Sequence, residues 1–322
     1  MSPPPPLDLP VVQVDRATKR FAGHTAVDEL SLSVPAGTIF GLLGPNGAGK
    51  TTTIRMLMDI YEPDAGTVRL FGTTAGGRTH SARIGYLPEE RGLYPRMRVL
   101  DVLVFLAEAK GVTRRAARVQ ALAWLERLGL GDWRLRKVSD LSKGMQQKVQ
   151  FISTMLHDPD LVVLDEPFAG LDPVNSQVLR DTVVEAGRRG KTILFSTHIM
   201  EHAEKLCDQV CIIARGKKLL DGSLPEVKQR HGGKHLVVAF DGNQGGAARI
   251  FGDPRLVAGV QDFGQEAELE LAPGADPQQI LRALVDSGAR LVRFELVTPS
   301  LHKIFVDLVG PDAAKAAALA TP

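Results

Sequence analysis

The sequence is poor in cysteine, has no excess of charge of either sign and contains no long hydrophobic run. Two cysteines in 322 residues, Cys207 and Cys211, cannot supply the four ligands of a structural zinc site, so we expect them to be buried thiols. The 39 Lys and Arg residues nearly cancel the 37 Asp and Glu residues, which removes the simplest electrostatic argument for a nucleic-acid partner. No apolar run approaches the roughly 18 residues that a membrane-spanning helix needs.

The N-terminus lacks the features of a signal peptide. Met1 and Ser2 are followed by a run of prolines, without the basic and apolar regions that such a peptide carries. We therefore expect a soluble, cytoplasmic chain in which residues 1–10 form a disordered, proline-rich arm. At the other end, the Ala-rich residues 311–322 predict a flexible tail.

Length and patterning indicate two domains between these ends. At roughly 100–200 residues per domain, 322 residues favour two domains over one. Gly232 and Gly233 follow a polar stretch and mark the predicted boundary. The expected domains are therefore residues 11–231 and 232–310.

Buried strands and helices alternate in the first of these domains. Short apolar runs at 38–43 and 161–164 are typical of strands buried on both faces of a parallel sheet. Helical spacing follows the first run at 51–60, and a further strand is expected at 192–196. This succession predicts an α/β fold with a mainly parallel sheet, with an edge strand that starts at Val11.

The pattern changes in the second domain to short strands and isolated helices. Residues 266–271 alternate Glu with Ala or Leu, as a half-buried strand does, and a further strand is expected at 290–297. The last helix is predicted to have Thr298 as its N-cap, Pro299 at its first position and Gly310 as its stop. We expect a small α+β module without a catalytic cluster.

A phosphate-binding loop follows the strand at 38–43. The loop has the pattern of Gly, four residues and Gly-Lys-Thr, and it precedes a helix, as its chemistry requires. Glycines let backbone N–H groups converge on phosphate oxygens, Lys50 reaches the β- and γ-phosphates, and the Thr51 hydroxyl coordinates Mg²⁺. An ordinary glycine-rich turn is the alternative. The residues are Gly44, Pro45, Asn46, Gly47, Ala48, Gly49, Lys50 and Thr51.

Two carboxylates end the apolar strand at 161–164. In nucleotide hydrolases such a strand lies near the phosphate loop, so that Asp165 can hold the metal and Glu166 can polarise the attacking water. The pair alone is a weak signal, because many surface turns look like it. Together with the phosphate loop, the pair predicts hydrolysis of a nucleoside triphosphate.

These residues resemble those of the ATP-binding cassette family, the nucleotide-binding subunits of ABC transporters, over roughly residues 11–230. The resemblance implies a P-loop NTPase cassette with a mainly parallel sheet, a β subdomain and a helical subdomain. Residues 141–146, Leu-Ser-Lys-Gly-Met-Gln, look like the family's signature sequence, in which Ser142 and Gly144 match. Lys143 replaces a glycine, and Met145 occupies the usual Gln position.

Further positions match the family's motifs one by one. Residues 169–172 resemble the D-loop, which crosses the interface between two cassettes. His198 matches the switch histidine that contacts the γ-phosphate, and Phe21 stands where the family places an aromatic that stacks on adenine. The alternative for Phe21 is an ordinary core residue near an edge strand.

One position departs from the family. Residues 84–90 resemble the Q-loop, but Glu89 stands where Gln is usual. A carboxylate there could coordinate Mg²⁺ or its water, while it adds negative charge near the γ-phosphate.

Two segments resemble parts of the family that meet other surfaces. The stretch from 91 to 137 resembles the helical subdomain that contacts a membrane partner's cytoplasmic helices; a covering insertion is the alternative. Residues 235–310 resemble the accessory domain of subunits paired with ABC-2-type exporter permeases. A dimer-stabilising appendage and a regulatory site remain alternatives for it.

The resemblance implies an ATP-hydrolysing subunit that works as a pair of cassettes, expected to be a homodimer, on a separate multi-spanning permease at the inner face of the cell membrane. The resemblance of residues 235–310 to the accessory domain of exporter subunits favours export over import. ATP and Mg²⁺ are the expected cofactors, with Lys50, Glu166 and His198 catalytic and Thr51, Asp165 and Glu89 at the metal. The expected nucleotide-binding residues are Phe21, Gly44, Pro45, Asn46, Gly47, Ala48, Gly49, Lys50, Thr51, Thr52, Ser142 and Gly144.

The alternative from another class is a soluble cassette ATPase that acts on nucleic acid or the ribosome. The balanced charge, the single cassette and the lack of a long coiled-coil insertion disfavour it. A non-hydrolysing regulatory module is disfavoured because Lys50, Asp165, Glu166 and His198 are all present.

Overall fold

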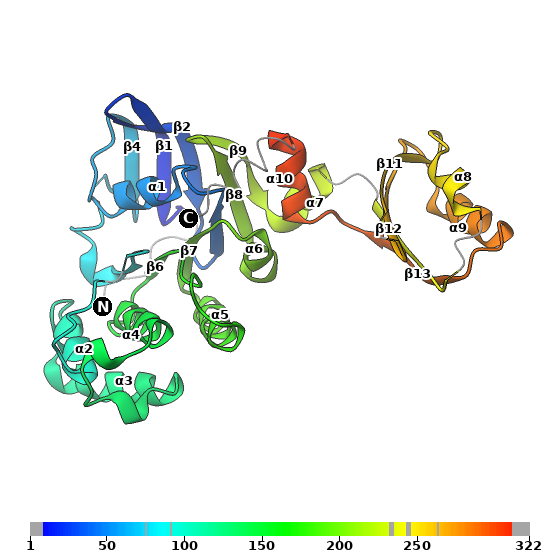
Figure 1. Ribbon diagram of the computed structural model, residues 1–322. Helices are drawn as coiled ribbons and strands as arrows, with labels where there is room; N and C mark the ends of the chain where they lie inside the picture. Colours follow the sequence, from blue (N-terminus) through cyan, green and yellow to red (C-terminus); the bar gives the residue numbers. More distant parts are fainter. Residues whose placement is uncertain are drawn as a thin grey trace. The chain divides into compact units, whose positions relative to one another are not determined.

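The computed structural model describes residues 9–74, 76–90, 92–231, 235–242, 246–262 and 264–310. The chain divides into two compact units, one formed by residues up to Leu224 with the terminal segment from Val309, the other by Pro225–Leu308 (Figure 1). Most of the predicted proline-rich arm, the predicted tail and the Gly232-Gly233 boundary lie outside the described residues.

The larger unit is built on a six-stranded sheet that confirms the predicted fold class (Figure 1). Five strands run parallel, and the last pairs antiparallel with its neighbour. In spatial order the strands are β5 (Ile84–Leu87), β6 (Leu161–Asp165), β7 (Thr192–Thr197), β3 (Ile39–Leu43), β8 (Gln209–Ala214) and β9 (Lys217–Ser223). Every residue of β3, β6 and β7 is buried, as the continuous apolar runs predict.

Helices connect the parallel strands of this sheet. They are α1 (Lys50–Leu57) after β3, α5 (Pro173–Arg188) after β6 and α6 (Met200–Leu206) after β7. Because all the parallel strands run in the same direction, the residues that follow β3, β6 and β7 gather at one edge of the sheet.

A second sheet of three antiparallel strands lies beside α1. Its order is β2 (His24–Val34), β1 (Val12–Phe21), β4 (Ala65–Leu70). The prediction that the strand starting near Val11 is an edge strand is wrong, because β1 pairs on both sides: Val12 lies opposite Val34 in β2 and opposite Leu70 in β4. Pairing on both sides completes the burial of Val12, which is fully buried.

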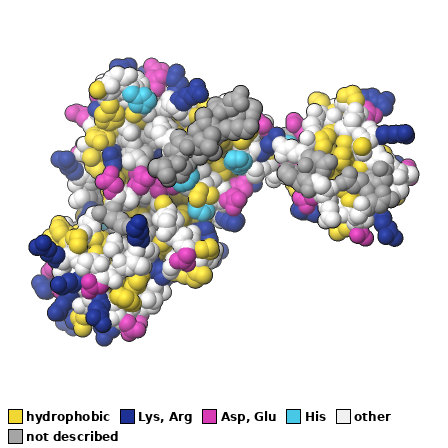
Figure 2. Space-filling model, in the orientation of Figure 1, with side chains coloured by type: hydrophobic (Ala, Val, Ile, Leu, Met, Phe, Trp, Pro, Cys, Tyr) yellow, Lys and Arg dark blue, Asp and Glu magenta, His cyan; other side chains and the backbone are white. Residues whose placement is uncertain are grey.

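The stretch between β5 and β6 is mainly helical, with two short 3-10 turns at Gly131–Trp133 and Val138–Asp140, and another 3-10 turn, Ser81–Arg83, directly precedes β5. Helix α2 (Val99–Glu108) packs against both α3 (Arg114–Arg127) and α4 (Lys143–Met155) (Figure 1). Lys and Arg side chains gather over this helical subdomain (Figure 2), among them the exposed Arg114 and Arg115.

Both cysteines are buried thiols, as predicted. Cys207 ends α6 and Cys211 lies in β8. Burial raises the pKa of Cys211 to about 12 and that of Cys207 well above its usual value, so both stay protonated. Cys207 also explains a glycine in β3, because a Cβ on Gly41 would lie 2.7 Å from its Sγ.

The smaller unit has a four-stranded antiparallel sheet in the order β11-β12-β10-β13 (Figure 1). Its core joins apolar residues of the strands, such as Leu236 and Leu269, to Ile280 and Leu284 of α9. Its elements are α7 (Leu224–His231), β10 (His235–Phe240), α8 (Ala247–Phe251), β11 (Val257–Asp262), β12 (Glu266–Leu271), α9 (Pro277–Asp286), β13 (Leu291–Val297) and α10 (Leu301–Val309).

Helix α10 begins later than predicted. Ser300, not Thr298, is its cap: the Ser300 hydroxyl accepts a hydrogen bond from the Lys303 N–H at 3.1 Å, and its carbonyl accepts from the Ile304 N–H at 3.0 Å. A Ser hydroxyl next to the first turn competes well with a Thr two residues earlier. Gly310 has a positive φ of 82°, in keeping with its predicted role as the stop.

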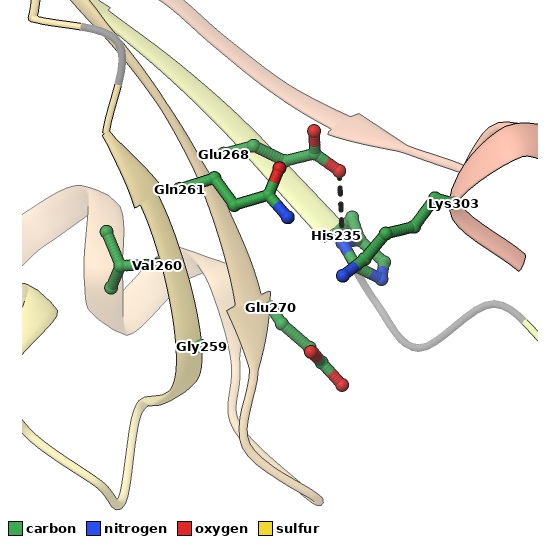
Figure 3. Close-up of a pocket in the computed structure, with 7 residues that line it drawn as sticks. All are labelled: His235, Gly259, Val260, Gln261, Glu268, Glu270 and Lys303. Atoms are coloured by element: carbon green, nitrogen blue, oxygen red, sulfur yellow. Dashed lines mark ion pairs between the residues drawn. The ribbon is translucent and has the colours of Figure 1, made fainter. Parts of the chain in front are cut away.

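The sheet face that carries the alternating glutamates of β12 is polar and holds a hollow of about 130 Å³ (Figure 3). The buried His235 of β10 contacts Glu268 there, with Nδ1 and Oε1 3.2 Å apart. Lys303 of α10 and Gln261 of β11 also line the hollow. Basic and acidic side chains thus offset one another across this face.

Among the described residues, no helix combines the length and the apolar character needed to cross a membrane.

Candidate functional site

The loop between β3 and α1 has a backbone that only glycine allows at two positions. Gly44 has a φ of 156°, and a Cβ there would lie 2.2 Å from the Ile213 carbonyl oxygen. Gly49, the N-cap of α1, has a φ of 103°, and a Cβ there would lie 2.4 Å from the Ala26 carbonyl oxygen. The backbone of β8, at Ile213, and of β2, at Ala26, therefore leaves room only for glycine at these two positions. The N–H groups of the loop lie directly before the N-terminus of α1.

Lys50 is held inside this loop. Its Nζ donates to the carbonyl oxygens of Gly44 at 2.8 Å and Pro45 at 3.1 Å, and it lies 3.5 Å from Oε1 of Glu166. The side chain is only 6% exposed. Burial lowers the pKa of Lys50, while Glu166 and Asp165 act in the opposite direction. The ammonium group is therefore a positioned charge, with carboxylates on one side and loop carbonyls on the other.

One hydroxyl of β7 holds the two residues at the end of β6. Ser196 Oγ donates to Asp165 Oδ1 at 2.5 Å and accepts from the backbone N–H of Glu166 at 3.1 Å. Glu166 has a positive φ of 47°, which is uncommon for a residue with a side chain. This turn directs the Glu166 side chain back toward the loop.

Glu166 contacts two cationic or potentially cationic partners. Besides Lys50, its Oε1 lies 3.0 Å from Nδ1 of His198, which follows β7. The Glu166 side chain is 8% exposed and the His198 ring is 35% exposed. The structure therefore brings the three predicted catalytic residues into one cluster, with Glu166 in the middle.

A set of oxygens near this cluster suits a hard divalent cation. Asp165 Oδ2 is buried and has no hydrogen-bond partner, and burial raises the pKa of this carboxyl group. The Thr51 hydroxyl acts in the other direction on that pKa, and its Oγ1 lies 3.5 Å from Oε2 of Glu89. The Thr51 hydroxyl and the Glu89 carboxylate thus lie near one buried, unpartnered carboxylate oxygen, and oxygen is the donor type that Mg²⁺ prefers.

The described residues contain no group of three or more His, Cys, Asp or Glu arranged to hold a metal ion by themselves. Magnesium in nucleotide sites is usually held by one or two side chains together with phosphate oxygens. The donor set at Asp165 and Thr51 fits that arrangement.

A cavity of about 470 Å³ opens in front of the loop. The predicted residues Phe21 and Glu89 line it together with Glu166 and most of the loop. Phe21 is 40% exposed and packs edge-on against Tyr61, with ring centroids 5.3 Å apart, so its ring is available at the cavity and is not a core residue. The lining residues are Phe21, His24, Ala26, Asn46, Gly47, Ala48, Gly49, Lys50, Thr51, Thr52, Glu89 and Glu166.

Sequence reasoning missed two of these lining residues, His24 and Ala26. No motif includes these two residues. Strand pairing brings His24 to the cavity, because β1 and β2 form a hairpin in which Phe21 lies opposite His24. A hairpin reading of the two-residue connection Ala22-Gly23 could have found His24.

Ser142 and Gly144 are not among the residues that line this cavity. Ser142 caps α4, where its hydroxyl accepts from the Met145 N–H at 3.3 Å. Gly144 lies near Leu171, whose Cδ2 would be 3.5 Å from a Cβ at this glycine. The signature and D-loop segments therefore adjoin each other, apart from the phosphate loop.

Two glutamines at the end of the signature segment, Gln146 inside it and Gln147 directly after it, have structural partners. Gln146 donates to the carbonyl oxygens of Val138 and Leu141, at 3.3 Å and 3.1 Å. Gln147, which is 4% exposed, donates to the Pro167 carbonyl at 3.2 Å. The second bond ties α4 to the segment directly after Glu166, a link that the sequence did not reveal.

Asp172 of the D-loop caps α5. Its Oδ1 accepts from the N–H groups of Val174 at 3.1 Å and Asn175 at 3.0 Å, and the bonds to Asn175 hold the pKa of its carboxyl group low. The capping bonds fix the segment that follows Glu166.

A phosphate loop between a buried strand and a helix, with paired carboxylates at the same edge of the sheet, defines a P-loop nucleoside triphosphatase. The model of the "ABC transporter" family matches residues 27–169, and that of the "ATP-binding protein DrrA1-3-like, C-terminal domain" matches residues 222–309. The chain belongs to the ATP-binding proteins of ABC transporters, a family of ATP-hydrolysing cassettes.

Relatives cover both units of the chain. An uncharacterized ABC transporter ATP-binding protein of Bacillus subtilis (strain 168), YhaQ, is 42% identical over 93% of this chain and 99% of its own length. A Nod factor export ATP-binding protein I of Rhizobium sp. (strain N33) is 34% identical over 92% of this chain and 96% of its own. A solved structure of the ATP binding subunit of an ABC transporter superposes with a TM-score of 0.64 at 29% identity, over 68% of this chain and 92% of that one.

Proposed function

We propose that this chain energises export through a separate membrane permease, on whose cytoplasmic side it docks. Subunits of this family work with membrane permeases, and several relatives are named for Nod factor export. Support for export also comes from the match of residues 222–309 to a DrrA1-3-like C-terminal domain. We further propose the domain limits 11–231 and 232–310.

The cavity in front of the loop takes ATP in this proposal. Phe21 stacks on the adenine, and residues Gly44 to Thr52 surround the phosphates with N–H groups and the Lys50 ammonium. The single observation that carries the assignment is Lys50, a buried cation held between two loop carbonyls and Glu166 at the floor of the cavity.

Glu166 is the proposed base for the attacking water. Its Oε1 already accepts from two sides, Lys50 and His198, so its second oxygen is available to accept a proton from water. From its position beside Glu166, His198 orients the carboxylate and contacts the γ-phosphate. Glu166 lies at a strand end fixed by Ser196, so little reorganisation is needed at the moment of reaction.

Thr51, Asp165 and Glu89 are the proposed metal-facing residues. A magnesium ion held by these residues would supply positive charge that offsets the negative charge of the phosphate oxygens. Asp165 has the unpartnered oxygen for it, Thr51 supplies a neutral hydroxyl, and Glu89 adds a carboxylate 3.5 Å from that hydroxyl.

Two copies are needed to complete the site. Ser142 and Gly144 lie at the N-terminus of α4, where N–H groups and a hydroxyl suit a phosphate, yet they do not line the cavity of their own chain. We propose that they close the cavity of a second copy, in a homodimer. All the residues of a complete site are present in this chain, which makes a second identical copy sufficient.

The helical subdomain is the proposed permease contact. Tyr94 and Phe105 are 49% and 46% exposed and pack edge-on with centroids 5.7 Å apart. An exposed aromatic pair among basic side chains suits a partner surface close to anionic lipid headgroups.

The test is to tag Glu166→Gln in the native host, solubilise membranes with ATP present and identify what co-purifies. We expect a stoichiometric multi-spanning protein. A variant that stays in the soluble fraction, or that brings ribosomes or DNA with it, would overturn the transport proposal while leaving the ATPase chemistry in place. Lys50→Ala is the matched control, since it should lose the ATP-dependent enrichment.

A further inference from the structure

Strand β13 ends the sheet of the smaller unit and has no strand on its outer side among the described residues. Edge strands with exposed apolar side chains are templates for pairing with another chain. Here Val292 is 71% exposed and Leu296 is 54% exposed. The charged residues between them, Arg293 and Glu295, are about half exposed, at 47% and 54%.

The sequence of β13, Leu-Val-Arg-Phe-Glu-Leu-Val over residues 291–297, is complementary to itself. When it is paired antiparallel with a copy of itself about Phe294, Arg293 falls opposite Glu295 and Val292 falls opposite Leu296. Each of these pairs occurs twice, once on each side of the central Phe294. Such directly opposite pairs, apolar with apolar and acid with base, are the ones that stabilise a sheet.

We propose that β13 pairs with β13 of a second copy of this chain, antiparallel and centred on Phe294, to join two four-stranded sheets into one of eight. The occupant follows from charge complementarity, because a twofold axis through Phe294 places Arg293 of each copy opposite Glu295 of the other. A self-complementary patch is what a twofold symmetric interface requires. This inference rests on the proposed function only in that both involve two copies of the chain.

The register on the inner side of β13 is compatible with such pairing. Its residues 293–297 pair regularly with β10, and the one irregularity lies between Leu291 and Arg293. Within one copy, Arg293 contacts Glu295, with Nη2 and Oε2 2.6 Å apart. When a second copy pairs with β13, Arg293 can exchange Glu295 of its own strand for Glu295 of the partner strand, which then lies directly opposite. Glu295 can exchange Arg293 in the same way.

The opposite edge of the sheet serves as an internal comparison. Strand β11, Val-Ala-Gly-Val-Gln-Asp over residues 257–262, would place Val257 opposite Asp262 in the corresponding twofold pairing. It also has an irregular register between Val257 and Gly259. Self-pairing is therefore favoured at β13 and not at β11.

The test uses the full chain without nucleotide, so that the ATP-dependent pairing of cassettes in the proposed function does not contribute. Sedimentation velocity over a range of protein concentration measures the association. We expect the unaltered chain to form dimers, and Arg293→Glu and Glu295→Arg each to remain monomeric, because each places like charges opposite one another twice.

Mixing the two variants provides the decisive measurement. One copy then carries two acids and the other two bases at these positions, so every cross-strand pair is again opposite in charge, and we expect dimers to return. The combined variant R293E/E295R should dimerise by itself for the same reason. A contact that only operates within one chain predicts no rescue on mixing, because neither variant regains its internal pair.

Leu296→Lys should abolish association, while Val260→Lys, a matched exposed apolar position that is 41% exposed on β11, should leave it intact. Circular dichroism verifies that each variant is folded. A monomeric unaltered chain, or dimers that persist equally in all variants, would overturn the proposal. ATP-driven pairing of the cassettes is measured separately with Glu166→Gln. A failure of Glu166→Gln to pair with ATP would not affect the conclusion about β13. ATP-driven pairing that persists in Glu295→Arg would not count as evidence for pairing through β13.

Discussion

The two units differ in where they keep their charged groups. In the larger unit, Lys50, Asp165 and Glu166 are buried at the ends of neighbouring elements and contact one another or a shared serine. In the smaller unit, the glutamates of β12 and the Arg293–Glu295 pair lie on exposed faces or at an edge. Buried charges are costly and are retained where they act on a ligand, whereas exposed charges cost little and shape surfaces.

The contrast teaches which unit carries chemistry. Burying charged groups in a site lowers the stability of the fold. When such a charge is removed, the site is therefore expected to lose function sharply while the fold gains stability. A unit with an apolar core and solvated charges is expected to lose stability when its core is cut, without an effect on the chemistry elsewhere. The following substitutions test the contrast.

The largest effect is expected for Glu166→Gln. Removing the base should lower the turnover number about 10²- to 10⁴-fold, the usual contribution of a general base, while ATP still binds. Steady-state ATPase assays and equilibrium ATP titration measure the two properties. Unchanged turnover would contradict the role of Glu166.

Leu269→Ala should cut the core of the smaller unit without affecting hydrolysis. Leu269 is fully buried in that core, and its truncation should cost about 2–5 kcal/mol of stability there. Hydrogen exchange of β10 and β12 should rise while the ATPase rate of the cassette is retained.

Leu42→Ala is the matched control for this substitution. Leu42 is equally buried but lies in β3, directly before the phosphate loop, so its truncation should lower stability and hydrolysis together. If Leu269→Ala also abolished hydrolysis, the contrast between the units would fail.

Asp165→Asn should raise the stability of the nucleotide-free chain at mildly alkaline pH. Burial raises the folded-state pKa of Asp165, so the folded state holds its proton more tightly than the unfolded state, and stability is lost as pH rises through the folded pKa. Relief of about 1 kcal/mol corresponds to about 2–4 °C in Tm for a unit of this size.

The same linkage makes the gain in Asp165→Asn pH-dependent. As the pH falls through the folded-state pKa, Asp165 becomes neutral and the difference in Tm from Asn should shrink. Thermal unfolding at several pH values measures this. A variant that is less stable than the unaltered chain at alkaline pH would contradict a destabilising effect of burying this carboxylate.

The smallest effect is expected for Glu89→Gln. The carboxylate lines the cavity 3.5 Å from the Thr51 hydroxyl, and among the described residues no backbone N–H donates a hydrogen bond to it. ATP affinity should change less than about tenfold, equivalent to less than about 1.4 kcal/mol, whereas the Mg²⁺ concentration for half-maximal binding should rise. Complete loss of ATP binding would contradict this.

The phosphate loop and the strand of Asp165 could be predicted from sequence because their chemistry fixes both residue type and spacing. Gly44 and Gly49 are required because the carbonyl oxygens of Ile213 and Ala26, distant in sequence, leave no room for a Cβ. Both glycines are nevertheless part of the phosphate-loop motif, so they can be recognised from the local sequence. The fold class followed for a similar reason, since strands buried on both faces have continuous apolar runs.

Features that depend on partners across the fold could not be predicted. Whether β1 is an edge or a central strand depends on β4 arriving beside it, and alternation within residues 11–14 is the same in either case. The hydrogen bond from Gln147 to the Pro167 carbonyl and the position of His24 at the cavity have the same origin. The start of α10 differed because two residues on either side of Pro299, Thr298 and Ser300, can both cap.

Ser196 has a consequence for the newly made protein. It lies in β7 and holds Asp165 and Glu166 of β6 in place beside a loop that follows β3, so three segments from residues 39–43, 161–165 and 192–197 must assemble before the carboxylates are positioned. A chain still emerging from the ribosome therefore cannot position these two carboxylates until residues up to Thr197, more than half of its length, have been synthesised and folded.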